Sequence, residues 1–253
     1  MNIKTFVIDQ KLNYQEHYCN DKYVNKYYEI ENTGVAINLN TIPDACVDFQ
    51  FACLEGKNVI YASGSFLQSK RSPTSHYSWC FGVKFNPGKY PLLVREIILN
   101  LIERHRVIDN CPWLNAIAED IYKASSFQER TEIFEERFPF ESQFGGSNSM
   151  VDTIMDHIEK THGMISIAEI AKKLQYNQRY MGRVFHGATG LTMKKYATII
   201  RIQTALRYLQ RGRVDEVYET LGYYDQSYFI KEFKTYTSMT PRQYCKKTGM
   251  DIV

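Results

Sequence analysis

The sequence predicts an α+β protein of two domains, with a β-rich, barrel-like N-terminal domain that ends in helices and an all-helical C-terminal domain. Short β-branched and aromatic runs between residues 33 and 94 predict strands, and apolar residues at three- and four-residue spacing predict helices after them. An internal repeat in the C-terminal part predicts two similar helical units. At 253 residues, the chain is long enough to bury two modest cores without disulfides or metal ions.

The expected strands are the four runs VAINLN, VDFQF, VIYASGSF and WCFGVKF, which are separated by turn-forming residues such as Asn86, Pro87 and Gly88. Because no helix-length segment lies between the runs, they favour a small barrel or sandwich over a parallel sheet. Residues 1–32 are aromatic but irregular, and they predict no particular element.

Helical spacing begins after Pro91 and continues through VREIILNLIERH, PWLNAIAEDIYKA and FQERTEIFEERF, where Pro112 suits a first helical turn. For the acidic third segment a solvated face is favoured over a dimer contact. The next stretch, PFESQFGGSNS, has the composition of a linker. We therefore expect an N-terminal domain over residues 1–138, a linker over 139–149 and a C-terminal domain over 150–249.

Charge is distributed unevenly along the chain. Residues 151–253 carry 16 Lys and Arg against 10 Asp and Glu, a net charge of +6, so the chain total of +3 leaves −3 for residues 1–150. This asymmetry predicts a polyanionic partner for the C-terminal part alone. The start does not resemble a signal peptide, and no run of about 18 apolar residues occurs, so we expect a cytoplasmic protein with no membrane partner.

Motifs for catalysis and metal binding are absent from the sequence. The six cysteines include no C-x-x-C pair, which argues against a zinc cluster or redox motif and favours reduced thiols. The six histidines show neither H-x-H nor H-E-x-x-H spacing, and no G-x-S-x-G, P-loop or G-x-G-x-x-G motif occurs. We therefore expect no enzyme activity, no metal and no cofactor.

The repeat aligns LQYNQRYMGRVFHGATGLTMKKY with LGYYDQSYFIKEFKTYTSMTPRQY, and it pairs Tyr180 with Tyr228 and Phe185 with Phe233. The offset is 48 residues after the turn and 47 before it, so the second copy has one extra turn residue. Two units of helix, turn and helix are predicted. A long helix over MKKYATIIRIQTALRYL, which Gly212 ends, joins them.

Each unit is expected to present one helix with a packed face and a polar face. In the first unit Ser166 and Glu169 form a capping-box pattern and Asn177 is the expected cap of the second helix. At 100° per residue, Arg179 and Arg183 then lie opposite the apolar side chains of that helix.

The second unit repeats this phase, with Asp225 as the expected cap. Phe229 and Phe233 gather on one side of the helix, and Lys231 and Lys234 gather on the other. Donors on the exposed face of such a helix suit a DNA major groove. The alternative is that these charged residues form only a solvated face. The recurrence of the same pattern in both units argues against this alternative.

Spacing supports the same interpretation. The connecting helix would be about 25 Å long at about 1.5 Å per residue. That length is close to what is needed to set two recognition helices about 34 Å apart, in successive major grooves on one side of the duplex.

These segments resemble the AraC/XylS family of bacterial transcription regulators. The second unit follows the family signature as G-Y-Y-D-Q-S-Y-F-I-K-E-F-K-x-x-x-x-M-T-P-R-Q-Y. The segments I-S-I-A-E-I-A-K-K-L, R-Y-M-G-R-V-F, G-L-T-M-K-K-Y and R-I-x-x-A-L-R-Y-L match the first unit and the connecting helix. The resemblance covers residues 150–247 and implies a double helix-turn-helix domain that binds double-stranded DNA.

By this resemblance, the base-contacting side chains are Arg179, Arg183, Gln226, Ser227 and Lys231. The side chains placed near the DNA backbone are Ser166, Asn177, Gln178, Thr192, Lys194, Lys195 and Lys234. Arginine can contact guanine through two hydrogen bonds, whereas lysine is a point charge, so we expect the first helix to be the more stringent. Backbone contacts position the protein without specifying sequence.

Some residues depart from the family pattern. Gly182 lies where a longer side chain usually reaches a base, and Tyr218 replaces a small residue at a helix crossing. Gln175 and Tyr223 replace a glycine and a phenylalanine in the turns, which we expect to be tolerated.

The N-terminal part, through PDACVDFQF and FGVKFNPGKYPLL, is similar to β-rich, cupin-like domains that precede AraC-type DNA-binding domains. This resemblance implies a sensor or dimerisation module and names no ligand. From the residues themselves, the candidates for an effector pocket are Cys46, Asp48, His76 and Trp79, although a β-domain of this length also needs aromatic residues for its core. For Cys46 and Asp48 an ordinary structural role is favoured. The implied partners are DNA, RNA polymerase, a small-molecule effector and a second copy of the chain. The alternative is a domain that only dimerises or contacts proteins and binds no small molecule.

Overall fold

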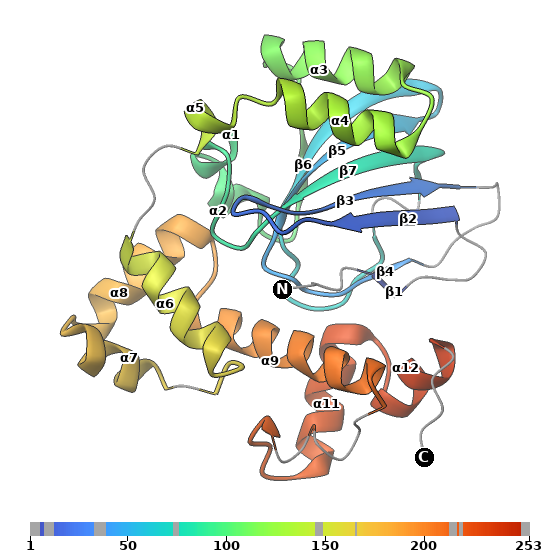
Figure 1. Cartoon of the computed structure of the whole chain (residues 1–253). Coiled ribbons are helices and arrows are strands. Elements are labelled where there is room, and N and C mark those ends of the chain that lie inside the picture. The colour runs from blue at the N-terminus through green and yellow to red at the C-terminus, as the bar shows by residue number, and fades with distance from the viewer. Residues whose placement is uncertain are drawn as a thin grey trace.

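The computed structural model describes residues 6–7, 13–32, 39–72, 76–144, 149–164, 166–212, 217 and 220–248. Figure 1 shows an N-terminal part built on a twisted sheet, with helices α3 (Pro112–Lys123) and α4 (Phe127–Arg137) over one face, and a helical C-terminal part. The two-domain α+β fold expected from the sequence is confirmed. Over the described ranges, no helix combines the length and the apolar character that crossing a membrane requires.

The sheet has six antiparallel strands in the order β2-β3-β7-β5-β6-β8, and β1 pairs with β4 in a separate ribbon. The strands are β1 (Phe6–Val7), β2 (Asn13–Tyr18), β3 (Val24–Glu31), β4 (Asn40–Thr41), β5 (Val47–Leu54), β6 (Lys57–Ser63), β7 (Trp79–Phe85) and β8 (His105–Val107). Three of the four expected runs form β5, β6 and β7. The run VAINLN lies mostly outside the described residues, and β2 and β3 come from the stretch that predicted no element.

Residues alternate between the two faces of this sheet, and the faces differ in chemistry. On the helix-covered face the ring of Phe134 from α4 lies 6.1 Å from the ring of Phe51, within a core of buried aromatic and aliphatic side chains. The other face carries buried polar side chains: Lys26, Tyr28, Asp48, Gln50 and Lys84. Burying polar groups is costly unless they bind one another, and here they do so through hydrogen bonds and ion pairs.

The segment VREIILNLIERH does not form the single helix that its apolar spacing predicted. It contains parts of two short helices, α1 (Leu92–Arg95) and α2 (Ile98–Leu101), and then turns at Glu103, which has a φ of +61°. A left-handed residue cannot continue an α-helix, and the amide of Glu103 instead donates to the carbonyl of Ser65 as the chain enters β8. The spacing identified the buried side chains correctly: Val94, Ile98 and Leu101.

The chain between the two domains is partly packed against the sheet domain. Within the expected linker, Phe140–Gln143 form the short helix α5, and the ring of Phe144 stacks on Tyr23 at 4.1 Å. Residues 145–148 lie outside the described ranges, and α6 begins at Ser149.

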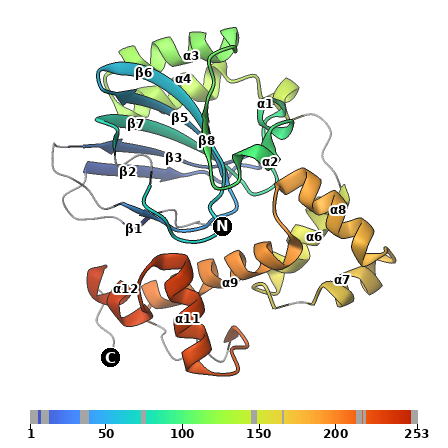
Figure 2. The ribbon, with the colours of Figure 1, turned by 180° about the vertical axis from the view of Figure 1, so that it is seen from behind.

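The C-terminal part contains α6 (Ser149–Lys160), α7 (Ile167–Leu174), α8 (Gln178–Thr189), α9 (Met193–Gln210), α11 (Gln226–Thr237) and α12 (Pro241–Lys247). Figure 2 shows α7 and α8 at one end of the long helix α9, and α11 and α12 at its other end. Most of the first helix of the second unit, including the Tyr218 position, lies outside the described residues. Helix α9 ends next to Gly212, which has a φ of +72°.

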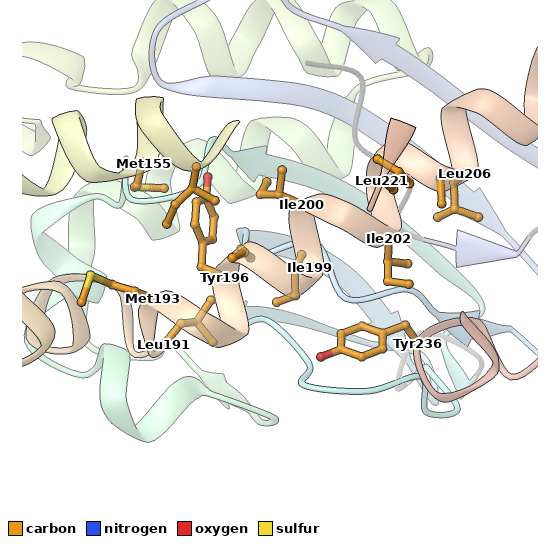
Figure 3. Packing of buried hydrophobic residues seen from close by; sticks show 14 of the residues in the cluster. Met155, Leu191, Met193, Tyr196, Ile199, Ile200, Ile202, Leu206, Leu221 and Tyr236 are labelled. Atoms are coloured by element: carbon orange, nitrogen blue, oxygen red, sulfur yellow. The ribbon is translucent and has the colours of Figure 1, made fainter. Parts of the chain in front are cut away.

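Helix α9 is the centre of the C-terminal core. Its side chains Ile199, Ile202 and Leu206 are fully buried, and Figure 3 shows apolar side chains on several sides of the helix. A helix that is apolar around most of its circumference must be enclosed by its neighbours. Burying each such side chain contributes about 1.5–3 kcal/mol to stability, so α9 is held in a fixed position between the two units.

Candidate nucleic-acid interface

The first helix-turn-helix unit is built by local hydrogen bonds that the sequence encodes. Ser166 and Glu169 form a complete capping box at the start of α7. Gln175 ends α7 in the left-handed conformation, with a φ of +57°, which explains why a glycine would also suit this position. The side chain of Asn177 then accepts the amide hydrogen of Arg179 at 2.8 Å and starts α8.

Helix α8 has one buried face and one exposed cationic face. Met181 and Phe185 are fully buried, whereas Arg179 and Arg183 are exposed. The guanidinium of Arg183 lies 5.6 Å from the ring centre of Tyr180, which is a cation–π distance that restricts where this side chain points. The helix therefore presents arginine donors on the face opposite its core.

Helix α11 repeats this arrangement in the second unit. The carboxylate of Asp225 accepts the amide hydrogen of Tyr228 at 2.7 Å and caps the helix. Phe229 and Phe233 are fully buried. The exposed face carries Gln226, Ser227, Lys231 and Lys234.

The capping side chains keep hydrogen-bond donors for an external partner. The hydroxyl oxygens of Ser166 and Thr192 accept backbone amide hydrogens of Glu169 and Lys195, both at 3.1 Å. Each cap uses an acceptor site, so the hydroxyl hydrogen stays available, and both side chains are exposed. Gln178 is also exposed at the start of α8.

Helix α9 sets the distance between the two recognition helices. Its 18 residues correspond to a length of about 27 Å at about 1.5 Å per residue. The units lie at its two ends in both views (Figures 1 and 2). This length is comparable with, but shorter than, the about 34 Å between successive major grooves on one side of a duplex.

Two adjacent lysines at the start of α9 have different environments. Lys194 is exposed. The amine of Lys195 donates to the carbonyl oxygen of Leu67 at 3.0 Å and to the hydroxyl of Tyr236 at 2.9 Å. Lys195 is thus engaged in a contact between the two domains rather than directed to solvent.

The N-terminal domain contacts the C-terminal domain at several points. Gln203 of α9 donates to the carbonyl of Pro43 at 2.9 Å, and the amide of Ser69 donates to the carbonyl of Thr235 in α11 at 3.0 Å. Near the other unit, the amine of Lys89 lies 2.6 Å from the carboxylate of Asp152 in α6. These contacts could not be predicted from the sequence, because each joins residues far apart in the chain.

The four candidate effector residues do not form one site. Cys46 and Asp48 are buried beside a cavity of about 20 Å³, which has room for about one water molecule. His76 lines a separate open cleft. Trp79 lies on the helix-covered face of the sheet, with the guanidinium of Arg130 at 4.9 Å from its ring.

A buried lysine neutralises the acidic groups near Cys46. The amine of Lys84 lies 2.7 Å from Asp44 and 2.5 Å from Asp48. Burial alone would lower the pKa of Lys84, but the two carboxylates raise it above its ordinary value, so the amine stays protonated. Burial raises the pKa of the Cys46 thiol, which keeps that cysteine unreactive. Within the described ranges, no group of His, Cys, Asp and Glu is arranged to hold a metal ion.

The part of the chain that carries these recognition helices is similar to known proteins. A helix-turn-helix domain family matches residues 170–247. The uncharacterized transcriptional regulatory protein YesN of Bacillus subtilis (strain 168) is 27% identical over 137 residues, which are 51% of this chain and 37% of YesN. The Msm operon regulatory protein of Streptococcus mutans is 27% identical over 119 residues, which are 44% of this chain and 42% of that protein. The chain thus matches less than half the length of these relatives.

A solved structure, ToxT from Vibrio cholerae, is similar over 96% of this chain and 99% of its own chain. The identity is 16% and the TM-score is 0.44.

Proposed function

We propose that this chain, whose C-terminal region is a helix-turn-helix domain of the AraC/XylS type, is a sequence-specific transcription regulator that binds double-stranded DNA. The observation that carries the proposal is the matched pair of helices α8 and α11, which share their cap position, their buried face and their exposed donors. A solvated charged face would have no reason to recur at equivalent positions. The chain would act in the cytoplasm by binding alone, without catalysis.

We assign the base contacts to the exposed donors of the two recognition helices: Arg179, Arg183, Gln226, Ser227 and Lys231. The two arginines favour guanine, because a guanidinium matches the two acceptors of its major-groove edge. The second helix, which has lysine and short polar donors, would bind with looser geometry.

We assign backbone contacts to the donors at the helix ends: Ser166, Asn177, Gln178, Thr192, Lys194 and Lys234. Helix N-termini and side-chain hydroxyls are common phosphate partners, and they fix the register of the protein on the duplex. Lys195 would join this set only if its contacts with Leu67 and Tyr236 were broken.

Selection of bound sequences from a random duplex library by the full chain tests this proposal. The expected result is a bipartite site whose two halves are centred about 10 base pairs apart. Arg183→Ala should lose the preference at one base position of one half-site, and the control Lys57→Ala, at the exposed start of β6, should retain both half-sites. Recovery of no enriched sequence would contradict the proposal.

We further propose that the N-terminal domain controls the DNA-binding domain through its contacts with α9 and α11. The bonds from Gln203 to Pro43 and from Ser69 to Thr235 support this role, because they connect the sheet domain to the connecting helix and to the second recognition helix. A small-molecule effector, a second copy of the chain or RNA polymerase could each act by changing these contacts.

The alternative is an N-terminal domain that works by protein contact or dimerisation alone. The cavity of about 20 Å³ beside Cys46 favours it, since an organic ligand would not fit there without rearrangement. Thermal unfolding of the full chain against a panel of metabolites, with light scattering for its mass, separates the two. Stabilisation by one compound supports effector control, whereas a ligand-independent dimer supports the alternative.

A further inference from the structure

The exposed tyrosines of the described chain all lie in the two helix-turn-helix units. Tyr176 and Tyr180 are 49% and 43% exposed, and Tyr224 and Tyr228 are 101% and 55% exposed. Every other tyrosine in the described ranges is buried or half-buried. The 48-residue offset of the repeat places Tyr176 on Tyr224 and Tyr180 on Tyr228. The exposure is therefore a feature that both units share.

Tyr176 and Tyr224 each come directly before the capping residue of a recognition helix. A side chain at this position commonly packs on the fourth residue of the helix and fixes the entry of the chain. In the second unit the preceding residue, Tyr223, has this role, because its ring lies 4.8 Å from the ring of Phe229. Tyr224 is left fully exposed, so packing does not account for it.

The surroundings of Tyr176 suit an anionic partner. It lines an open groove of about 570 Å³ between α7 and the start of α8, together with Lys172, Gln178 and Arg179. No carboxylate contributes to this lining. The start of α8 adds the partial positive charge of a helix N-terminus. A phosphate is complementary to all of these groups.

We propose that Tyr176 and Tyr224 are matched contacts to the DNA backbone, with each phenolic hydroxyl donating a hydrogen bond to a phosphate beside the groove that its helix enters. This inference rests on the proposed DNA-binding function. Both residues precede the helix instead of lying on its inserted face, so a phosphate is a more accessible partner than a base edge. Tyrosine is among the side chains that proteins use for such contacts.

Each of the two equivalent units would supply one such tyrosine contact. One tyrosine would fix the start of α8 against one groove, and its equivalent would fix α11 against the next. Together they would set the register of both helices on the duplex, which neither the arginines nor the lysines do through base contacts alone.

The test compares Tyr176→Phe and Tyr224→Phe in the full chain, using a duplex selected with the wild-type protein. Each change removes only the hydroxyl, and each should weaken binding about 2- to 10-fold, with the double variant weaker than either. The loss should be equal for all base variants of the site. The slope of affinity against salt should not change, because tyrosine neutralises no charge.

Neutral methylphosphonates, introduced singly along each strand, identify the contacted phosphates. At two positions the methylphosphonate should weaken DNA binding by the wild-type protein. The same substitution should weaken binding by the matching Phe variant by a smaller factor. Tyr122→Phe is the control, because α3 lies beyond the sheet from both units and its hydroxyl binds Val59 within the N-terminal domain (Figure 1).

Wild-type affinity in the double Phe variant would overturn the inference. A loss that depends on base identity would overturn the phosphate assignment, and a loss seen with alanine but not phenylalanine would overturn the role of the hydroxyl. Failure of the wild-type chain to bind any selected duplex would instead reject the proposed function.

Discussion

The side-chain amide of Gln203, in the middle of α9, donates a hydrogen bond of 2.9 Å to the backbone carbonyl of Pro43 in the N-terminal domain. Gln203 is only 1% exposed. A polar side chain is buried at a domain boundary at little cost only when its partners are held in place. The bond therefore links the sheet domain to the helix that carries both recognition units.

Replacing Gln203 by Ala should lower the free energy of unfolding by about 1–3 kcal/mol, because a buried carbonyl loses its donor. Chemical denaturation of the full chain measures this change. Arg211→Ala, at the exposed end of the same helix, is the control and should leave stability unchanged. A Gln203→Ala protein as stable as wild type would mean that the domains are not held together at this point.

The cap of the second recognition helix carries a negative charge where the first has a neutral amide. Asp225→Asn should raise DNA affinity several-fold at low salt, because a carboxylate close to the phosphates is removed while asparagine caps a helix about as well as aspartate. Titration at two salt concentrations checks this, and the gain should shrink as salt screens the charge. Unchanged or weaker binding at low salt would mean that the start of α11 does not lie close to the DNA phosphates.

Arg183 should specify one base. Arg183→Ala is expected to cost about 1–3 kcal/mol at one position of the site and little at the others. Tyr180→Leu should give a weaker version of the same pattern, because the ring that orients the guanidinium at 5.6 Å is lost. Competition with single-base variants of the site measures both. A uniform loss across all variants would make Arg183 a phosphate contact.

The different environments of Lys194 and Lys195 predict different salt dependence. Lys194→Ala should reduce the slope of log affinity against log salt by about 0.9, the value for one phosphate contact. Lys195→Ala should leave the slope unchanged and lower thermal stability, since its amine binds Leu67 and Tyr236. Equal slopes for the two variants would show that Lys195 leaves these partners when DNA binds.

Removing the buried cation of the sheet domain should make stability depend on pH. Lys84→Met leaves Asp44 and Asp48 buried without their partner, which should cost about 3–5 kcal/mol at pH 7. Burial already raises the pKa of Asp48, and without the opposing effect of the Lys84 amine it would rise further above that of the unfolded chain. The variant should become more stable as pH falls from 7 to 5, because protonation is then favoured in the folded state.

Thermal unfolding across this pH range, with Lys84→Met/Asp48→Asn as a partial rescue, measures the effect. A variant whose stability falls with pH would contradict it.

Local features of the DNA-binding domain could be predicted from the sequence because their causes are local. The caps Ser166, Asn177 and Asp225 and the two helix faces depend on residues within one or two turns of each other. The repeat added a second, independent observation of the same pattern. These are the features for which spacing along the chain is a direct measure of position in space.

The features that could not be predicted depend on distant residues. The single helix that spacing favoured is interrupted at Ile97 and ends at Leu101, and the amide of Glu103 then donates to the distant Ser65. The amine of Lys195 donates a hydrogen bond to the carbonyl of Leu67, which is 128 residues away in the chain. Trp79 is separated from Asp48 because the two lie on opposite faces of the sheet, whereas His76 lies over the same face as Asp48 but lines another cleft. Sequence patterns could suggest these residues as candidates but not their grouping.

Methylation interference on the selected duplex with the full chain is the most direct test of the central claim, that one chain places two recognition helices in successive major grooves. Two clusters of interfering guanines should appear about 10 base pairs apart on one face, because α9 sets that separation. Arg183→Ala should abolish interference at one guanine of one cluster, and Lys231→Ala should weaken interference in the other cluster. A single cluster, or loss of both clusters with either substitution, would contradict the account.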